Sequence, residues 1–406
     1  MLGGGELAMR ESRGIILFLV ALQALVLTNN VTTMLLGGIL GAALAPDVSW
    51  ATIPITTFVV GAALTSIPAS LLMRKMGRRF GFAIGSGIGL LGSAVCALAV
   101  LRRDFVMFSA GTFLNGSYNA FGQFYRLAAG EAVPESDRSR AISYVLGGGI
   151  LGAFIGPLSA TETKDLFATS YVGPYVVLMG CAALSLLLLA FLRVAPPRLH
   201  AEAPSEPARP LAVIVVQPGF LAAVLGAVTG YAVMNFLMTA TPLAMSHHHH
   251  GDADTAFVFQ WHVIAMFAPS FFTGALIQRF GVTTIMAVGA VLMAATTGFA
   301  HAGTSVSMFW TALVLLGIGW NFLYVGGTTM LLGCHRPSER GKVQGLNDML
   351  VFAATGTSSL LSGVLLYRFG WRGMALATLP LVAAALVALY WAKDRGAVAL
   401  PAKSNA

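Results

Sequence analysis

Two pairs of side chains, each spaced by one helical turn, could bind a soft metal ion. Met234 and Met238 lie in one apolar segment, and His262 and Met266 lie in the next. Residues at i and i+4 share a helical face, so each segment presents two donor atoms on one side. Thioether sulfur suits Cu(I), and neutral imidazole also binds copper. The pattern therefore predicts a copper site formed by these four residues.

The depth of these four residues in a membrane supports the same hypothesis. At 1.5 Å per residue, Met238 and His262 form a rung about 10 Å below the outer surface. Met234 and Met266 form a second rung about 15 Å down, near the middle of a ~30 Å hydrocarbon core. Methionine is often only a packing residue. An ionisable residue inside a span is costly, however, which makes His262 the stronger indication of function.

Four consecutive histidines, His247 to His250, lie between these two apolar segments. A histidine-rich loop can bind many divalent metals without serving transport. We expect the run to capture metal ions at the outer surface.

Several polar and aromatic residues inside apolar segments could instead contact an organic ring. Asn119 and Asn321 are the candidates for lining a central cavity, with these neighbours: Tyr118, Gln123, Trp320 and Tyr324. Amide and aromatic side chains keep an organic solute open as the alternative cargo.

The composition requires a membrane setting for all of these residues. The 406 residues are 57% hydrophobic and 10% charged, whereas a soluble domain has about 45–50% and 25%. Lys and Arg are scattered among apolar runs despite the net charge of +8, which disfavours nucleic-acid binding. Cys96, Cys181 and Cys334 lie in or beside apolar segments and form no disulfide framework or metal motif. We therefore expect an integral membrane protein of the all-α class and not an enzyme.

Twelve apolar stretches are long enough to cross a membrane: 15–42, 51–73, 81–101, 105–126, 141–159, 171–192, 217–243, 255–277, 282–301, 306–333, 343–366 and 374–392. If both termini are cytoplasmic, most of the 24 Lys and Arg residues lie on the cytoplasmic side, as the positive-inside rule requires. We expect a multi-pass protein of the bacterial inner membrane, with the lipid bilayer around it and both ends in the cytoplasm.

The chain divides into two halves that repeat one another. A polar stretch from Arg193 to Pro210, rich in Ala, Glu and Pro, predicts a disordered linker. The expected domains are a six-helix half over 1–192, a cytoplasmic linker over 193–212 and a second six-helix half over 213–406. Arg138 and Arg340 stand in matching contexts, P-E-S-D-R-S-R and P-S-E-R-G-K, and Gly77 matches Gly281.

This parallel six-plus-six repeat with a central linker resembles the major facilitator superfamily over the whole chain. The loop ending in Gly77, Arg78 and Arg79 is similar to that superfamily's G-x-L-A-D-R-x-G-R-R signature, but Arg74 stands where the signature has an acid. The resemblance implies that this loop latches the halves together on the cytoplasmic side. Asp348 is our candidate gating partner for Arg74.

The M-x-x-x-M and H-x-x-x-M pairs resemble the signature of CcoA-type copper importers. That likeness implies that Met234, Met238, His262 and Met266 bind copper during uptake. The stretches W-N-F-L-Y and V-Q-G-L-N-D also fit, but they are shared with the sister group of riboflavin importers.

Copper uptake by alternating access is the function that these resemblances favour. Riboflavin or another small organic solute is the alternative, and a metal sensor on a carrier scaffold is a third class. Copper enters as substrate, with no prosthetic group. We expect a monomer that exchanges copper with periplasmic or cytoplasmic chaperones.

Overall fold

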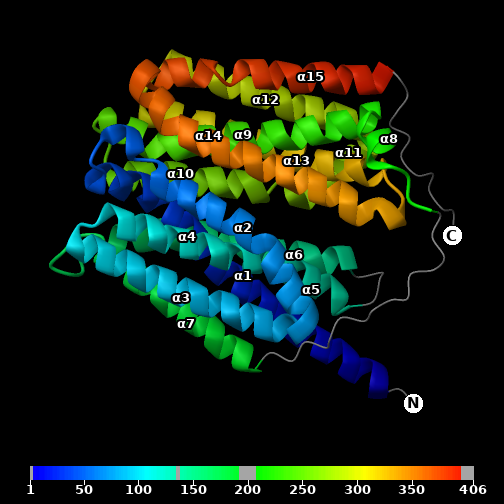
Figure 1. Ribbon diagram of the computed structural model, residues 1–406, viewed down its shortest axis with the longest axis horizontal. Coiled ribbons are helices and arrows are strands. Elements are labelled where there is room, and N and C mark those ends of the chain that lie inside the picture. The colour runs from blue at the N-terminus through cyan, green and yellow to red at the C-terminus, as the bar shows by residue number, and fades with distance from the viewer. Residues whose placement is uncertain (1–2, 134–137, 192–206, 395–406) are drawn as a thin grey trace. The chain divides into compact units, whose positions relative to one another are not determined.

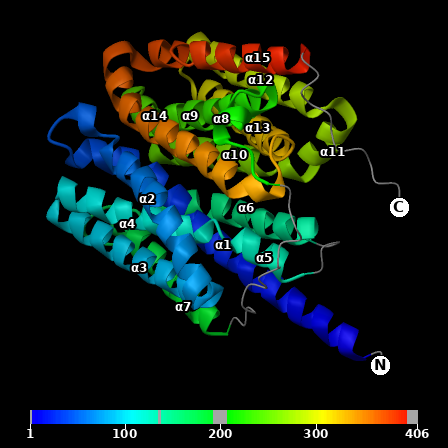
Figure 2. The ribbon, with the colours of Figure 1, turned by 45° about the vertical axis from the view of Figure 1, so that its right-hand side comes forward.

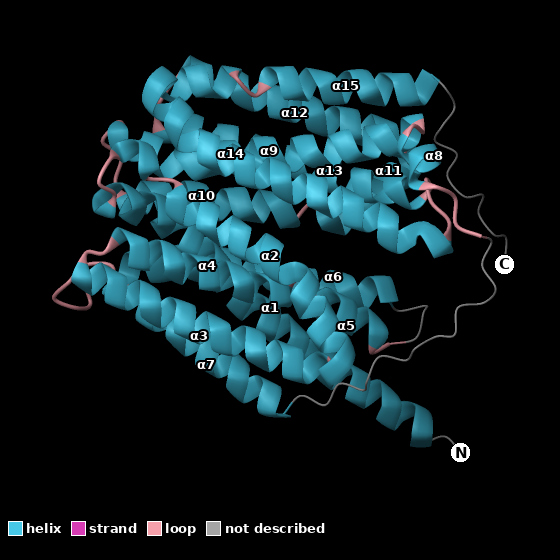
Figure 3. Cartoon of the chain, in the orientation of Figure 1, coloured by secondary structure: helices cyan, strands magenta, loops and turns pink. Residues whose placement is uncertain are grey.

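The computed structural model describes residues 3–133, 138–191 and 207–394. Those residues form helices and no strand, which confirms the all-α class (Figure 3). The elements run in the order α1 (Gly3–Leu44), η1 (Val48–Trp50), α2 (Ile53–Met76), α3 (Arg78–Arg102), α4 (Phe105–Gly122), α5 (Tyr125–Glu131), α6 (Arg138–Glu162), α7 (Val172–Phe191), α8 (Leu211–Val215), α9 (Pro218–His247), α10 (Asp252–Phe267), α11 (Ser270–Phe280), α12 (Val282–Ala302), α13 (Val306–Leu332), η3 (Pro337–Glu339), α14 (Arg340–Leu376) and α15 (Leu379–Asp394).

Each of the twelve predicted spans coincides with helical structure. In the described part of the chain, nine helical stretches are long and apolar enough to cross a membrane, or ten if the bent pair α10 and α11 is one span. The stretch Lys342–Asp394 contains both α14 and α15, and α4 accounts for the remaining predicted span. The predicted eighth span, 255–277, is a broken helix that bends by 45° between α10 and α11.

Two compact units make up the chain, and each is coloured along the sequence in Figure 1. Unit 1 contains α1 to α7 together with α10, and unit 2 contains α8, α9 and α11 to α15. Helix α10 therefore groups by its packing with helices that precede the linker in sequence. The sequence boundaries at 192 and 213 remain a prediction, and residues 192–206 of the expected linker lie outside the described residues.

Unit 1 is a layered helix bundle closed by small residues. Helix α3 lies between α4 and α7, as Figures 1 and 2 both show, while α1 packs along α6 and α2 along α4. The α2–α4 contact needs glycine, because a Cβ on Gly61 would lie 2.1 Å from the carbonyl oxygen of Phe113. Gly152 meets α1 in the same way, since a Cβ added there would lie 2.8 Å from the carbonyl oxygen of Ala24. Close backbone approach of this kind is how small residues join helices in a membrane.

Unit 2 repeats several helix-end features of unit 1, namely glycine turns and N-caps. Gly77 precedes α3 with φ of 87°, and Gly281 precedes α12 with φ of 86°, a conformation that favours glycine. Asp104 caps α4 by accepting from the Met107 N–H, and Ser305 caps α13 by accepting from the Met308 N–H. The matching ends of helices support the repeat that the sequence predicts.

Candidate functional site

Helix α9 presents the methionine pair inside unit 2. Met234 and Met238 are buried and lie one turn apart on this helix. Asn235, between them, donates from Nδ2 to the Thr355 carbonyl oxygen at 3.1 Å and to Ser358 Oγ at 3.2 Å. These bonds fix the rotation of α9 against α14. The face that carries both sulfur atoms is therefore set by packing, as a binding site requires.

Helix α10 presents the histidine and the other methionine inside unit 1. His262 is fully buried, and Met266 is buried one turn further on. Val263, next to His262, packs with Leu27 and Val31 of α1 and with Ala153 of α6. Because the two donor pairs belong to different units, the four-residue copper site and its two rungs remain a prediction.

The histidine run begins at the last residue of α9, and its described side chains form no metal cluster. The His247 and His248 rings lie 5.4 Å apart, and the His248 ring is 6.4 Å from that of Phe309. His249 has φ of 61°, which turns the chain toward α10. Within the described residues, no group of three or more His, Cys, Asp or Glu side chains could hold a metal ion. Capture of metal by this loop stays a prediction.

An aromatic cluster joins α9 to α13 in unit 2. The rings of Trp320 and Tyr324 stack at 4.9 Å with an interplanar angle of 13°. Tyr231 meets both of them edge-on, at 5.3 and 5.6 Å. Tyr324 and Tyr231 are half-buried, so the cluster is not sealed in the core. Tyr231 is absent from the residues expected from the sequence, although its position one turn before Met234 was a usable signal.

The polar residues expected to line a cavity divide into two kinds. Asn119 lies half-buried in unit 1, where its Oδ1 accepts from Asn30 Nδ2 at 3.5 Å and from Gln123 Nε2 at 3.4 Å. Asn321 is fully buried in unit 2, donating to Ser270 Oγ at 2.6 Å and accepting from Thr273 Oγ1 at 2.7 Å. Asn119 is thus partly exposed, whereas Asn321 ties α13 to the start of α11; the lining of a cavity by these residues remains a prediction.

Tyr118 is a further residue expected near a cavity. Its ring is buried in the core of unit 1, and its hydroxyl lies 3.2 Å from Ser185 Oγ. Packing in the core of unit 1 is therefore a sufficient explanation for Tyr118. The free cysteines Cys96 and Cys334 are buried, and Cys181 is half-buried.

The basic signature loop between α2 and α3 makes contacts inside unit 1. Arg78 forms an ion pair with Glu131, with Nη2 2.6 Å from Oε1. Arg79 donates from Nε and Nη2 to the carbonyl oxygens of Leu189 and Ala190, at 2.8 and 2.6 Å. These carbonyl groups lie in the last turn of α7, where the helix dipole favours a cation. The last two arginines of the loop therefore hold α3 to its neighbours.

The candidate gating residues lie at exposed positions in separate units. Arg74 is exposed in the last turn of α2, and Asp348 is exposed in α14, where it accepts from Asn347 Nδ2 at 3.1 Å. Their pairing as an inner gate remains a prediction.

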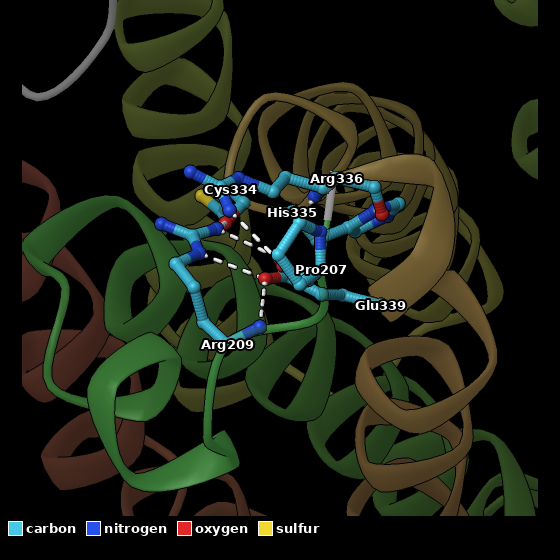
Figure 4. A network of polar contacts seen from close by, with 6 residues as sticks. All are labelled: Pro207, Arg209, Cys334, His335, Arg336 and Glu339. Carbon is cyan, nitrogen blue, oxygen red and sulfur yellow. Dashed lines mark hydrogen bonds and ion pairs between the residues drawn. The ribbon is translucent and has the colours of Figure 1, made fainter. Parts of the chain in front are cut away.

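One end of the linker is ordered, contrary to the expectation of disorder through Pro210. Arg209 donates from its backbone N–H and Nε to Glu339 Oε1, at 2.7 and 2.8 Å, and from Nη2 to Oε2 at 2.8 Å (Figure 4). The Arg336 N–H also donates to Oε2 at 2.9 Å. The composition of the linker favours disorder, but a buried carboxylate on the α13–α14 loop fixes its last residues. Nothing in the linker itself revealed that partner.

Neutralising Glu339 should release this anchor. Its side chain is 1% exposed, and Arg209 holds the pKa of its carboxyl well below the ordinary value of 4.5. We expect Glu339→Gln to lower the thermal midpoint by about 3 °C or more, since the half-buried guanidinium of Arg209 loses its counter-charge. Because folding lowers the pKa of this carboxyl, its contribution to stability is complete above about pH 4.5 and should decline progressively as the pH falls below that value, whereas the variant lacks this component of the pH dependence.

Thermal unfolding of detergent-purified protein at pH 7 and pH 4 measures both effects. Glu131→Gln, which breaks the more exposed pair with Arg78, is the matched control and should shift the midpoint less. Equal shifts of the thermal midpoint in the two variants would show that the Arg209–Glu339 pair stabilises the fold no more than the Arg78–Glu131 pair.

The chain matches the family described as Major Facilitator Superfamily over residues 14–268 and 223–405. It belongs to the major facilitator superfamily. Among curated relatives, this superfamily member is 39% identical to the riboflavin transporter RfnT of Brucella anthropi, over 95% of its own length and 98% of that protein. It is 32% identical to the uncharacterized MFS-type transporter YddS of Bacillus subtilis, over 80% and 79% of the two chains.

Solved structures give the same fold. The nucleoside transporter NupG superposes with a TM-score of 0.68 at 13% identity, over 95% of this chain and 100% of that one. The family match and the curated relatives confirm the major facilitator fold and the carrier class expected from the sequence. This superfamily protein is a multi-pass membrane transporter.

Proposed function

We propose that this carrier imports riboflavin across the bacterial cytoplasmic membrane by alternating access. The observation that carries the proposal is the similarity to RfnT, which spans nearly the whole of both chains. The bias of Lys and Arg toward one side supports an orientation with both termini in the cytoplasm. We further propose that it works as a monomer without a prosthetic group.

Two side-chain groups support a planar, polar cargo. In unit 2, the parallel stack of Trp320 and Tyr324 offers a flat apolar surface on which an isoalloxazine ring could continue the stack. In unit 1, the carboxamides of Asn30, Asn119 and Gln123 cluster at long hydrogen-bond distances, 3.4 and 3.5 Å. Carboxamides both donate and accept, as the polar edge of a flavin does. Neither group requires a metal ion.

Copper is the second candidate cargo, favoured by the buried donor pairs. Met234 and Met238 in unit 2, and His262 and Met266 in unit 1, are each buried at one-turn spacing within a span. Burial of a histidine at such depth carries a cost that function would explain. Under this alternative, the His247–His250 run collects the ion, and chaperones deliver and accept it.

Parallel uptake of both cargoes tests the proposal. Cells lacking their own riboflavin and copper uptake, expressing the carrier at a matched level, should accumulate labelled riboflavin well above vector controls. Accumulation of copper isotope without riboflavin would replace the proposal by the second candidate. Binding of either cargo to purified protein without net flux into vesicles would indicate a sensor instead.

A further inference from the structure

A charged cluster joins the α6–α7 loop to the first turn of α10 within unit 1. Lys164 Nζ donates to Asp252 Oδ2 at 2.5 Å, and the Tyr171 hydroxyl donates to the same oxygen at 2.8 Å. The Tyr171 N–H in turn donates to the Lys164 carbonyl oxygen at 2.7 Å. Lys164 Nζ also lies 4.8 Å from the centre of the Tyr171 ring. Lysine and tyrosine therefore form one preorganised receptor for the carboxylate.

This cluster is stronger than an isolated surface ion pair. Side chains of Lys164 and Asp252 are 31% and 35% exposed, so both are partly shielded from water. Two donors on one carboxylate oxygen give charge-assisted hydrogen bonds, which exceed neutral ones in strength. The bond to Asp252 raises the pKa of Lys164, so the lysine stays charged at any pH in which cells grow. Tyr171 holds its position with φ of 70°, an uncommon conformation that the surrounding contacts must maintain.

A second layer of contacts lies deeper along α10. Val263 packs with Leu27, Val31 and Ala153, from α1 and α6, about 16 Å along the helix from Asp252. The charged cluster thus lies at one end of a contact that contains an apolar cluster further along α10. An apolar contact alone has little driving force between helices that sit in lipid.

The connections of α10 tie it to unit 2 at both ends. His249, with φ of 61°, precedes the helix, and a break follows Phe267. Helices α9 and α11 on either side belong to unit 2, whereas α10 belongs to unit 1. Alternating access in this superfamily moves the halves of the sequence against each other. Lys164 and Tyr171 precede the central linker and Asp252 follows it, so the cluster connects the two halves of the sequence.

We propose that Lys164, Tyr171 and Asp252 form a latch that holds α10 against the α6–α7 loop at the membrane face opposite the central linker, and that it opens in each transport cycle. We call these three residues the outer latch. They are positioning residues, because they control the packing of α10 without contacting the cargo. The inference rests on the carrier class and not on whether riboflavin or copper is carried.

A buried reporter on α10 measures the state of the outer latch directly. Val263 is 2% exposed, so Val263→Cys should react slowly with a membrane-impermeant maleimide added to intact cells. Adding Asp252→Asn should raise its labelling rate about fivefold, as expected for loss of a partly exposed ion pair. The same protein without Val263→Cys gives the background from Cys96, Cys181 and Cys334. Asp254→Asn is the matched control, because Asp254 accepts only a 3.3 Å bond from the Gly251 N–H among the hydrogen bonds described for it.

Exchange of the charges distinguishes a latch from a general loss of packing. The double variant Lys164→Asp with Asp252→Lys should return the labelling rate at least halfway to that of wild type. Labelling equal in Asp252→Asn and Asp254→Asn, or no recovery on exchange, would overturn the latch. If Asp252→Asn fails to fold, Tyr171→Phe provides the same comparison. Absence of riboflavin uptake would refute the proposed cargo while leaving the labelling result intact.

Discussion

Replacing Tyr324 with leucine should raise the half-saturating riboflavin concentration about tenfold. Its ring stacks on Trp320 at 4.9 Å and is half-buried, which leaves it available to a planar solute. Stacking of a heterocycle on an aromatic side chain contributes about 1–3 kcal/mol, and 1.4 kcal/mol corresponds to a factor of ten. Initial rates of labelled riboflavin uptake, at several concentrations and matched expression, measure the change.

Two companion variants separate stacking from general damage to the carrier. Tyr324→Phe keeps the ring and should stay within about twofold of wild type if the face of the ring is what matters. Tyr367→Leu removes a tyrosine that is 70% exposed on α14 and serves as the matched control. An unchanged half-saturating concentration in Tyr324→Leu would remove the aromatic cluster from the riboflavin path.

If copper is the cargo, combining Met234→Leu with Met266→Leu should reduce copper uptake to less than about a tenth. Uptake of riboflavin, the proposed cargo, should stay within about twofold of wild type in the same double variant. Leucine nearly conserves the volume of methionine but has no sulfur to bind a soft metal. Each residue is buried in its own unit, so shape is preserved while one donor is lost from each pair. Parallel uptake of copper isotope and riboflavin by the same cells measures both cargoes.

Met293→Leu provides the control for this pair. Met293 is fully buried in α12, outside both motifs, and its replacement should affect neither cargo. Parallel loss of copper and riboflavin uptake in the double variant would indicate misfolding, and undiminished copper uptake would exclude these sulfurs as ligands. If wild type takes up no copper, the four donors are packing residues and riboflavin alone remains.

Local features of the sequence determined where the helices lie. Runs of apolar residues long enough to cross a bilayer require helices, because every backbone polar group must be satisfied within the span. Gly77 and Gly281 mark equivalent turns because only glycine takes their positive φ readily. The one-turn spacing of Met234 and Met238 also survives unchanged, since it depends only on the helix.

Contacts between distant residues were decided by the tertiary structure alone. The expected disorder of the linker was wrong at Arg209, which is held by hydrogen bonds to Glu339. Because Glu339 lies far along the chain, the linker sequence contained no sign of this contact. Asn321 resembles Asn119 in sequence context, yet Asn321 is buried against Ser270 and Thr273. Tyr231 joins its aromatic partners only through the packing of α9 on α13.

The grouping of α10 with unit 1 was also decided by the tertiary structure. Sequence order assigns this helix to the second half, whereas its apolar face and Asp252 attach it to α1, α6 and the α6–α7 loop. A hydrophobic run specifies that a segment enters the membrane, but lipid is as apolar as the neighbouring helix. Shape complementarity and a few polar contacts therefore choose the neighbour, and both depend on residues that only the folded chain brings together.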